Sequence, residues 1–166
     1  MAEGEQRAVR IERPNRRKAS SQATKAVVIL LLLVSAGLVL IVTIGGWTRL
    51  AGMQPVQIGY IVVYVLMAYY VARWNRGVLP LAAALAIILG IFAAIAGPGW
   101  FDRDKAGFSD PALAAGVLGL VTLLIVPVQV LLIAFSMRGF QQAWNVEVEV
   151  PEGETYDAAI HQPRTA

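Results

Sequence analysis

Three aspartates in one short polar segment are the residues best suited to bind a metal ion. They are Asp102, Asp104 and Asp110, at the first, third and ninth places of the segment, and Gly107 holds the sixth place. Calcium loops use oxygen ligands at these places and a glycine for the sharp turn. An alanine and a leucine stand where such a loop has its fifth and twelfth ligands. We treat the three aspartates as a candidate calcium site, with a polar loop capped by Asp110 as the alternative.

Polar residues inside the long apolar segments are the second place where chemistry could occur, because a polar group in hydrocarbon is costly. Ionisable acids, bases and histidine are absent from these segments, which argues against a proton relay or a carboxylate ion site. The polar residues at depth are Ser35, Thr43, Gln57, Tyr60, Tyr64, Tyr69, Tyr70, Thr122 and Gln129. Tyr60 and Tyr64 stand one helical turn apart. We interpret them as interfacial anchors, with a groove for a quinone or lipid as the alternative.

Pro127 stands near the middle of the last apolar segment, where a proline removes one backbone hydrogen bond and kinks a helix. Gln129 either satisfies a freed carbonyl or faces a neighbouring helix. Cysteine is absent and the single histidine is His161, which excludes disulfides, thiolate metal sites and cysteine nucleophiles. No phosphate loop, nucleophile elbow or dinucleotide-binding pattern occurs. The sequence therefore predicts neither an enzyme nor a bound cofactor.

The turn at residues 44–50 reads Ile-Gly-Gly-Trp-Thr-Arg-Leu. It resembles the Gly-Gly-x-Thr-Arg-Leu turn that closes the first helix of haem A synthases, which have eight helices and bind haem through histidines inside the bundle. The resemblance implies haem chemistry, but no histidine occurs in an apolar segment here and no carboxylate directly follows Leu50. As a whole, the chain resembles small bacterial membrane proteins with four spans, a resemblance that implies no activity.

All of these residues are set on or beside four apolar segments. Of the 166 residues, 57% are hydrophobic and 15% are charged, a composition that excludes an ordinary soluble domain. The uncharged segments are residues 26–48, 50–72, 77–101 and 111–137. Each exceeds the about 20 residues that a helix needs to cross a bilayer. We predict an all-α polytopic integral membrane protein, whose four transmembrane helices occupy about 26–47, 55–73, 78–97 and 111–137.

Two tails flank the predicted transmembrane domain of residues 26–138. Residues 1–25 are predicted to form a basic disordered tail, and residues 139–166 a second tail that is mostly disordered. Valine and glutamate alternate over residues 146–150, which is the pattern of a single strand. Because a lone strand is unstable, this segment is predicted either to be disordered or to pair with a partner.

Basic residues are distributed unevenly over the tails and loops. The first tail holds Arg7, Arg10, Arg13, Arg16, Arg17, Lys18 and Lys25. The second loop holds Arg73 and Arg76, whereas the first loop holds Arg49 alone. Because short basic flanks stay in the cytoplasm, we predict that both ends are cytoplasmic and that the chain is a multi-pass protein of the bacterial inner (plasma) membrane. The basic tail lacks interleaved aromatic residues, so we expect it to contact lipid headgroups and no nucleic acid.

Small residues recur at helical spacing in the third and fourth apolar segments. The predicted interface residues are Ala82, Ala86, Gly90, Ala94, Gly116 and Gly119. Such faces let helices approach closely, either within one chain or between copies.

These features favour an integral membrane protein without a catalytic site, most simply an accessory, assembly or scaffolding subunit. Its expected partners are the lipid bilayer and either another membrane protein or further copies of itself. The alternative is a small oligomeric channel or transporter component, with a pore lined by Thr, Gln and Tyr side chains. A haem-A-synthase-like enzyme fragment is the third hypothesis, and it depends on residues 44–50.

Overall fold

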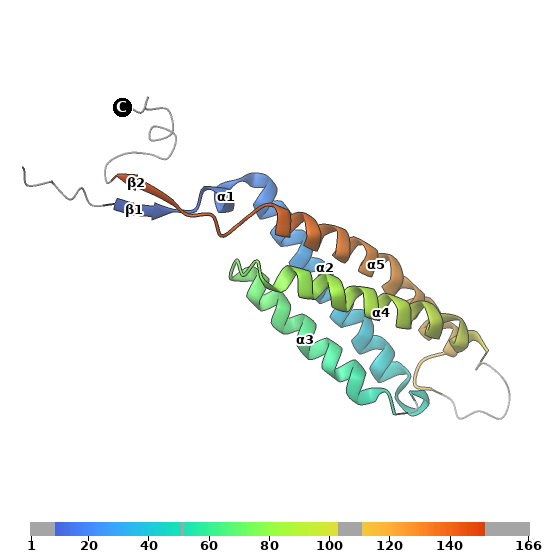
Figure 1. Ribbon diagram of the computed structural model, residues 1–166. Coiled ribbons are helices and arrows are strands. Elements are labelled where there is room, and N and C mark those ends of the chain that lie inside the picture. Colours follow the sequence, from blue (N-terminus) through green and yellow to red (C-terminus); the bar gives the residue numbers. More distant parts are fainter. Residues whose placement is uncertain (1–8, 51, 103–110, 152–166) are drawn as a thin grey trace, which may run out of the picture.

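The computed structural model describes residues 9–50, 52–102 and 111–151, and most of them are helical. In chain order the elements are β1 (Val9–Glu12), α1 (Pro14–Arg17), α2 (Ala19–Gly45), the 3-10 helix η1 (Trp47–Arg49), α3 (Gln54–Ala72), α4 (Val78–Phe101), α5 (Ala115–Gln141) and β2 (Val148–Pro151) (Figure 1). Within the described residues, four helices are long and apolar enough to cross a membrane, namely α2, α3, α4 and α5. The predicted set of four apolar helices is therefore confirmed.

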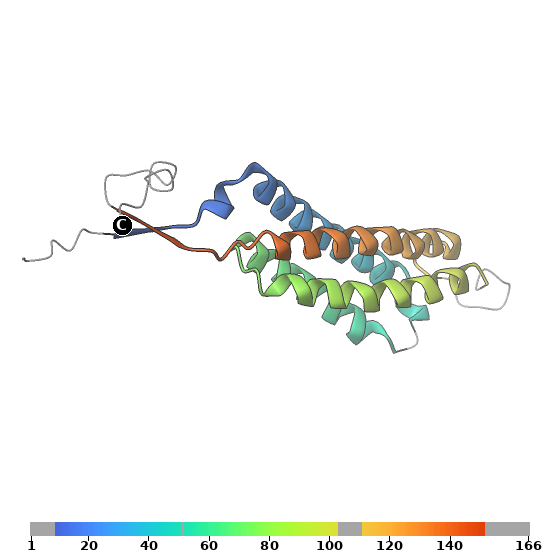
Figure 2. The same ribbon diagram turned by 45° about the horizontal axis from the view of Figure 1, so that its top comes forward.

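The four long helices run alongside one another as a bundle (Figures 1 and 2). α4 and α5 pack closely against each other, α2 contacts both α3 and α5, and α3 contacts α4 much less. Small residues make the close approach of α4 possible, because the side chains of Ala82 and Ala86 are fully buried. Large apolar side chains face outward, as on Ile95, which is 73% exposed. An apolar outer surface of this kind suits a bundle surrounded by lipid.

The last long helix begins later than the sequence suggested. The fourth transmembrane helix was expected to begin at about residue 111, but α5 begins at Ala115. The backbone N–H of Leu113 donates instead to the Gly45 carbonyl at 3.1 Å. This bond ties the segment before α5 to the end of α2, so residues 111–114 do not continue the helix.

The first long helix and the segment before it also differ from the prediction. Residues 1–25 were expected to be disordered, but β1, α1 and the first turns of α2 lie within the described part of that range. β1 pairs antiparallel with β2, with Val9 opposite Pro151 and Glu12 opposite Val148. The partner of the alternating valine segment is thus the first strand of the same chain, a pairing that no local sequence pattern specifies.

Both described ends of the chain lie at the same end of the bundle. The ribbon formed by β1 and β2 extends away from the helices, beyond the start of α2 and the end of α5 (Figures 1 and 2). η1 and the start of α5 lie at the opposite end (Figure 1). An even number of long helices brings the ends of the chain together in this way.

Candidate functional site

A buried polar cluster of Ser35, Tyr64 and Gln129 joins three helices in the bundle interior. The Tyr64 hydroxyl donates to Gln129 Oε1 at 3.0 Å, and Gln129 Nε2 donates to Ser35 Oγ at 2.9 Å. The Ser35 hydroxyl in turn donates to the Leu31 carbonyl at 2.7 Å. The hydrogen bonds therefore form a series in which α3 donates to α5 and α5 donates to α2. Each of the three side chains is almost completely buried.

The polar cluster corrects the interpretation of Tyr64 and decides between the two alternatives for Gln129. Tyr64 was interpreted as an interfacial anchor, but its ring is fully buried and its hydroxyl bonds to another helix. Gln129 faces neighbouring helices and does not bond a carbonyl freed by Pro127, around which α5 continues. Because no acid, base or activated nucleophile belongs to the cluster, its chemistry is that of a cross-link between helices.

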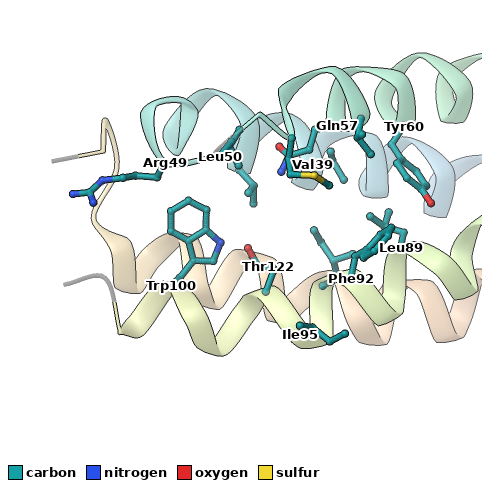
Figure 3. A pocket seen from close by; sticks show the side chains of 16 residues that line it. Val39, Arg49, Leu50, Gln57, Tyr60, Leu89, Phe92, Ile95, Trp100 and Thr122 are labelled. Atoms are coloured by element: carbon teal, nitrogen blue, oxygen red, sulfur yellow. The ribbon is translucent and has the colours of Figure 1, made fainter. Parts of the chain in front are cut away.

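A cavity of about 310 Å³ lies between α3 and α4, near the end of the bundle that carries η1 (Figure 3). Its lining residues are Val39, Val42, Arg49, Leu50, Met53, Val56, Gln57, Tyr60, Leu89, Phe92, Ala93, Ile95, Ala96, Trp100, Thr122 and Ile125. Arg49 and Trp100 stand at one end of the cavity, and Tyr60 and Leu89 stand at the other (Figure 3). The lining is mostly apolar, as in sites for hydrophobic ligands.

The polar side chains at the cavity wall are largely held by neighbouring groups. Thr43 Oγ1 lies 2.6 Å from Gln57 Oε1, which connects α2 to α3 behind the wall. The Thr122 hydroxyl donates to the Leu118 carbonyl of its own helix at 2.7 Å. Most of the other lining side chains are apolar, Tyr60 stands at one end of the cavity, and the cationic group of Arg49 stands at the other (Figure 3).

The two glycines of the turn at residues 44–50 are explained by packing. A Cβ atom on Gly46 would lie 2.5 Å from the Trp100 ring, and one on Gly45 would lie 2.5 Å from the Leu113 side chain. Both distances are too short for a side chain, so glycine lets α4 and the start of α5 approach the end of α2. No histidine lines the adjacent cavity.

Scans of protein-family models, of curated proteins and of solved structures find no match to this chain.

The predicted calcium site lies largely outside the described residues. Asp102 is exposed directly after α4, whereas Asp104 and Asp110 fall within the range 103–110, which the structure does not describe. Over the described ranges, no three His, Cys, Asp or Glu side chains are grouped closely enough to hold a metal. Calcium binding by this loop stays a prediction.

The predicted interface residues divide into two sets. Ala82, Ala86 and Gly119 are buried within the chain, and a Cβ on Gly119 would lie 2.8 Å from the Phe101 ring. A Cβ on Gly90 would meet Gln129 at an ordinary 3.5 Å. By contrast, Ala94 is exposed and Gly116 has open space beside it. Ala94 and Gly116 are therefore the members of the set that remain open to contacts between copies.

An aromatic cluster at the end of the bundle near the chain ends was not expected from the sequence. Trp144 is completely buried and stacks edge-on against Trp74, with ring centroids 5.2 Å apart. Lys25 lies over the Trp74 ring at 4.1 Å, and Arg16 Nε donates to the Trp144 carbonyl at 3.0 Å. Tryptophans beside the ends of membrane-spanning helices commonly lie at the membrane interface, but Trp144 is packed inside the chain. Burial lowers the pKa of Arg16 from its ordinary value, and the charge of Arg13 lowers it further.

The segments on either side of the aromatic cluster are tied to it by polar contacts. Asn15 Nδ2 donates to the Ala143 carbonyl at 3.1 Å. Arg76 Nε donates to the Phe140 carbonyl at 2.6 Å and Arg76 Nη1 donates to Asn145 Oδ1 at 3.0 Å. Sequence reasoning missed these contacts because their partners are far apart in the chain. The sequence does place basic residues, Trp74 and Trp144 at the same end of the predicted helices, and such residues often pack together.

Proposed function

We propose that this chain is a non-catalytic accessory or assembly subunit of a membrane complex, located in the cell membrane of a bacterium with both ends in the cytoplasm. The character of the bundle interior supports this proposal. The buried polar cluster of Ser35, Tyr64 and Gln129 is used to hold helices together, so it is not free to bind a substrate. The charge distribution of the tails and loops supports the orientation.

The observation that carries the proposal is the β1–β2 ribbon. The first and last described segments of the chain form one two-stranded antiparallel ribbon that extends beyond the helices (Figure 2). Over the described residues each strand pairs with the other strand alone, so each keeps one edge at which a further strand can add. Ile11 is 62% exposed on β1, which adds an apolar contact at this ribbon.

A two-stranded ribbon gains stability when a third strand adds to it. Main-chain hydrogen bonds then supply affinity, and side chains such as Ile11 supply selectivity. The aromatic cluster at Trp74 and Trp144 gives the ribbon a firm base, because it holds both chain ends at the bundle. We therefore propose that the ribbon receives a strand from a larger cytoplasm-facing subunit.

The test is purification of the tagged chain from native membranes in mild detergent, followed by protein identification and native mass. We expect a stoichiometric membrane-protein partner that is lost from the Ile11→Lys variant, because a lysine at a strand edge discourages pairing. The control is Thr48→Lys, which makes the same charge change on an exposed residue at the opposite end of the bundle. Retention of the partner by both variants would contradict the role of the ribbon.

A homogeneous homo-oligomer without other proteins would overturn the accessory role and favour the channel alternative. In that case the next measurement is solute flux through liposomes that contain the purified protein. A pore would then have to form between copies, because the polar cluster inside each copy is already hydrogen-bonded.

A further inference from the structure

The cavity between α3 and α4 opens toward the side of the bundle. Four of the side chains that line it are also substantially exposed on the outer surface, namely Met53 at 43%, Val56 at 43%, Phe92 at 48% and Ile95 at 73%. The sparse contact between α3 and α4 leaves this opening. If the four long helices cross a membrane, the opening faces the hydrocarbon of the bilayer and admits an apolar chain directly from it.

The length of the cavity matches one leaflet. Along α4 it extends from Leu89 to Trp100, which corresponds to about 16 Å at 1.5 Å per residue. The hydrocarbon core of a bilayer is about 30 Å thick, so this is about half of it. Tyr60 and Leu89 close the inner end (Figure 3). One acyl chain that enters from the leaflet on the η1 side would therefore fill the cavity.

The end of the cavity that carries Arg49 lies at the level where lipid headgroups would be. Trp47, which is 50% exposed, lies two residues before Arg49, and exposed tryptophans at helix ends mark the membrane interface. The Arg49 stem lines the cavity, and its guanidinium points out of the cavity toward the end of the bundle (Figure 3). A guanidinium has five N–H donors in a planar fork and suits the oxygens of a phosphate.

We infer that the cavity is a binding site for a single anionic phospholipid of the leaflet on the η1 side. One acyl chain lies between α3 and α4, and the phosphate-containing headgroup is bound by Arg49. The apolar lining favours binding of the lipid's acyl chain, and the charge of Arg49 favours an anionic headgroup over a zwitterionic one. This inference does not depend on the proposed accessory function, because it concerns the bundle and not the β1–β2 ribbon.

The test uses the purified full chain, exchanged into bilayers of equal phosphatidylglycerol and phosphatidylethanolamine and released for native mass spectrometry. We expect one retained phospholipid per chain, with phosphatidylglycerol retained about tenfold over phosphatidylethanolamine. Ala96→Phe fills the cavity and should lower retention at least fivefold. Ala84→Phe, an equally large change at an exposed residue of α4 that does not line the cavity, should leave retention unchanged.

The headgroup contact is tested separately. Arg49→Gln should leave a lipid bound but reduce the preference for phosphatidylglycerol to about twofold or less, whereas the exposed Arg73→Gln at the other end of the bundle should keep it. Absence of retained lipid, or equal losses in Ala84→Phe and Ala96→Phe, would overturn the inference. The inference would also be overturned if an isoprenoid quinone, or a helix of a partner protein, were found in the cavity in place of a phospholipid.

A second measurement covers the case in which Ala96→Phe fails to fold. Brominated phosphatidylglycerol quenches the fluorescence of a tryptophan that its chain touches, and Trp100 lines the cavity. We expect quenching of the unmodified chain at low fractions of brominated lipid, and loss of that component in Trp100→Phe. Identical quenching curves for the two chains would show that no acyl chain occupies the cavity.

Discussion

Gln129 uses both ends of its amide inside the bundle, as acceptor from Tyr64 and as donor to Ser35. Loss of the Gln129 amide leaves the buried Tyr64 hydroxyl without this acceptor, whereas the Ser35 hydroxyl keeps its bond to the Leu31 carbonyl. The strength of such bonds between helices in lipid is modest, because the separated helices also find partners there. The cluster is therefore expected to fix the relative rotation of α2, α3 and α5 more than to dominate stability.

The polar cluster predicts non-additive mutational effects. Tyr64→Phe and Gln129→Leu should each lower the free energy of unfolding by about 1 kcal/mol. The double variant should lose less than the sum of the two, because the second change removes a group that the first has already left unpaired. The measurement is equilibrium unfolding in mixed micelles with increasing sodium dodecyl sulfate. Strictly additive losses would show that the hydroxyl and the amide do not interact.

The close packing around Gly46 predicts that a substitution there lowers stability. Gly46→Ala places a Cβ 2.5 Å from the Trp100 ring and 3.0 Å from the Val42 carbonyl, so the end of α2 has to move. We expect a loss of about 1–3 kcal/mol from overpacking, measured in the same unfolding assay. Gly37→Ala, inside α2, has nothing within 4 Å of the added Cβ and serves as the control, with no loss expected. Equal stability of the two variants would contradict the close packing of Trp100.

At the scale of elements, the aromatic cluster holds the segments that lead to β1 and β2 against the helix bundle. Trp144 follows Ala143, whose φ of 49° turns the chain back toward the helices after α5 ends. That turn carries the Trp144 side chain into the space beside Trp74. The base of β2 is therefore fixed by packing, whereas the Arg13–Glu147 ion pair, which lies between the strands and the helices, is exposed.

This difference predicts which contacts hold the ends of the chain. Trp144→Ala should lower the free energy of unfolding by about 3–5 kcal/mol and increase hydrogen exchange over residues 9–17, because a large buried ring is lost. Glu147→Gln should cost less than about 1 kcal/mol, because exposed ion pairs contribute little. Hydrogen exchange read by mass spectrometry separates the two variants. Unchanged exchange over residues 9–17 in Trp144→Ala would show that this ring does not hold the first segment.

At the scale of the whole molecule, the four long helices place β1 and β2 at one end of the bundle and η1 at the far end (Figure 1). The charge distribution then predicts which end faces the cytoplasm. Because the chain contains no cysteine, single cysteines can be introduced without a background signal. Val146→Cys should react with a membrane-impermeant maleimide only from the cytoplasmic side, and Thr48→Cys only from the other side. Reversed labelling would contradict the orientation, and labelling of both positions from one side would contradict the arrangement of the helices.

Much of the architecture follows from the sequence by itself. Four long uncharged segments predict four helices because the length and hydropathy needed to cross a bilayer are local properties of a segment. Helix ends were less predictable where a distant contact intervenes, as at Ala115, where the Leu113 bond to Gly45 delays the helix. The polar residues at depth could be named, but their partners could not.

Only the tertiary structure decided which of those residues meet. It joined Tyr64 to Gln129, buried Trp144 against Trp74, paired β1 with β2 across nearly the whole chain, and left an apolar cavity between α3 and α4. Helices in lipid associate through the detailed fit of their surfaces, since their apolar faces are no less compatible with lipid than with each other. That fit depends on residues far apart in the chain. Composition and spacing therefore determined the number of helices, whereas side-chain packing determined where the polar cluster, the aromatic cluster and the cavity lie.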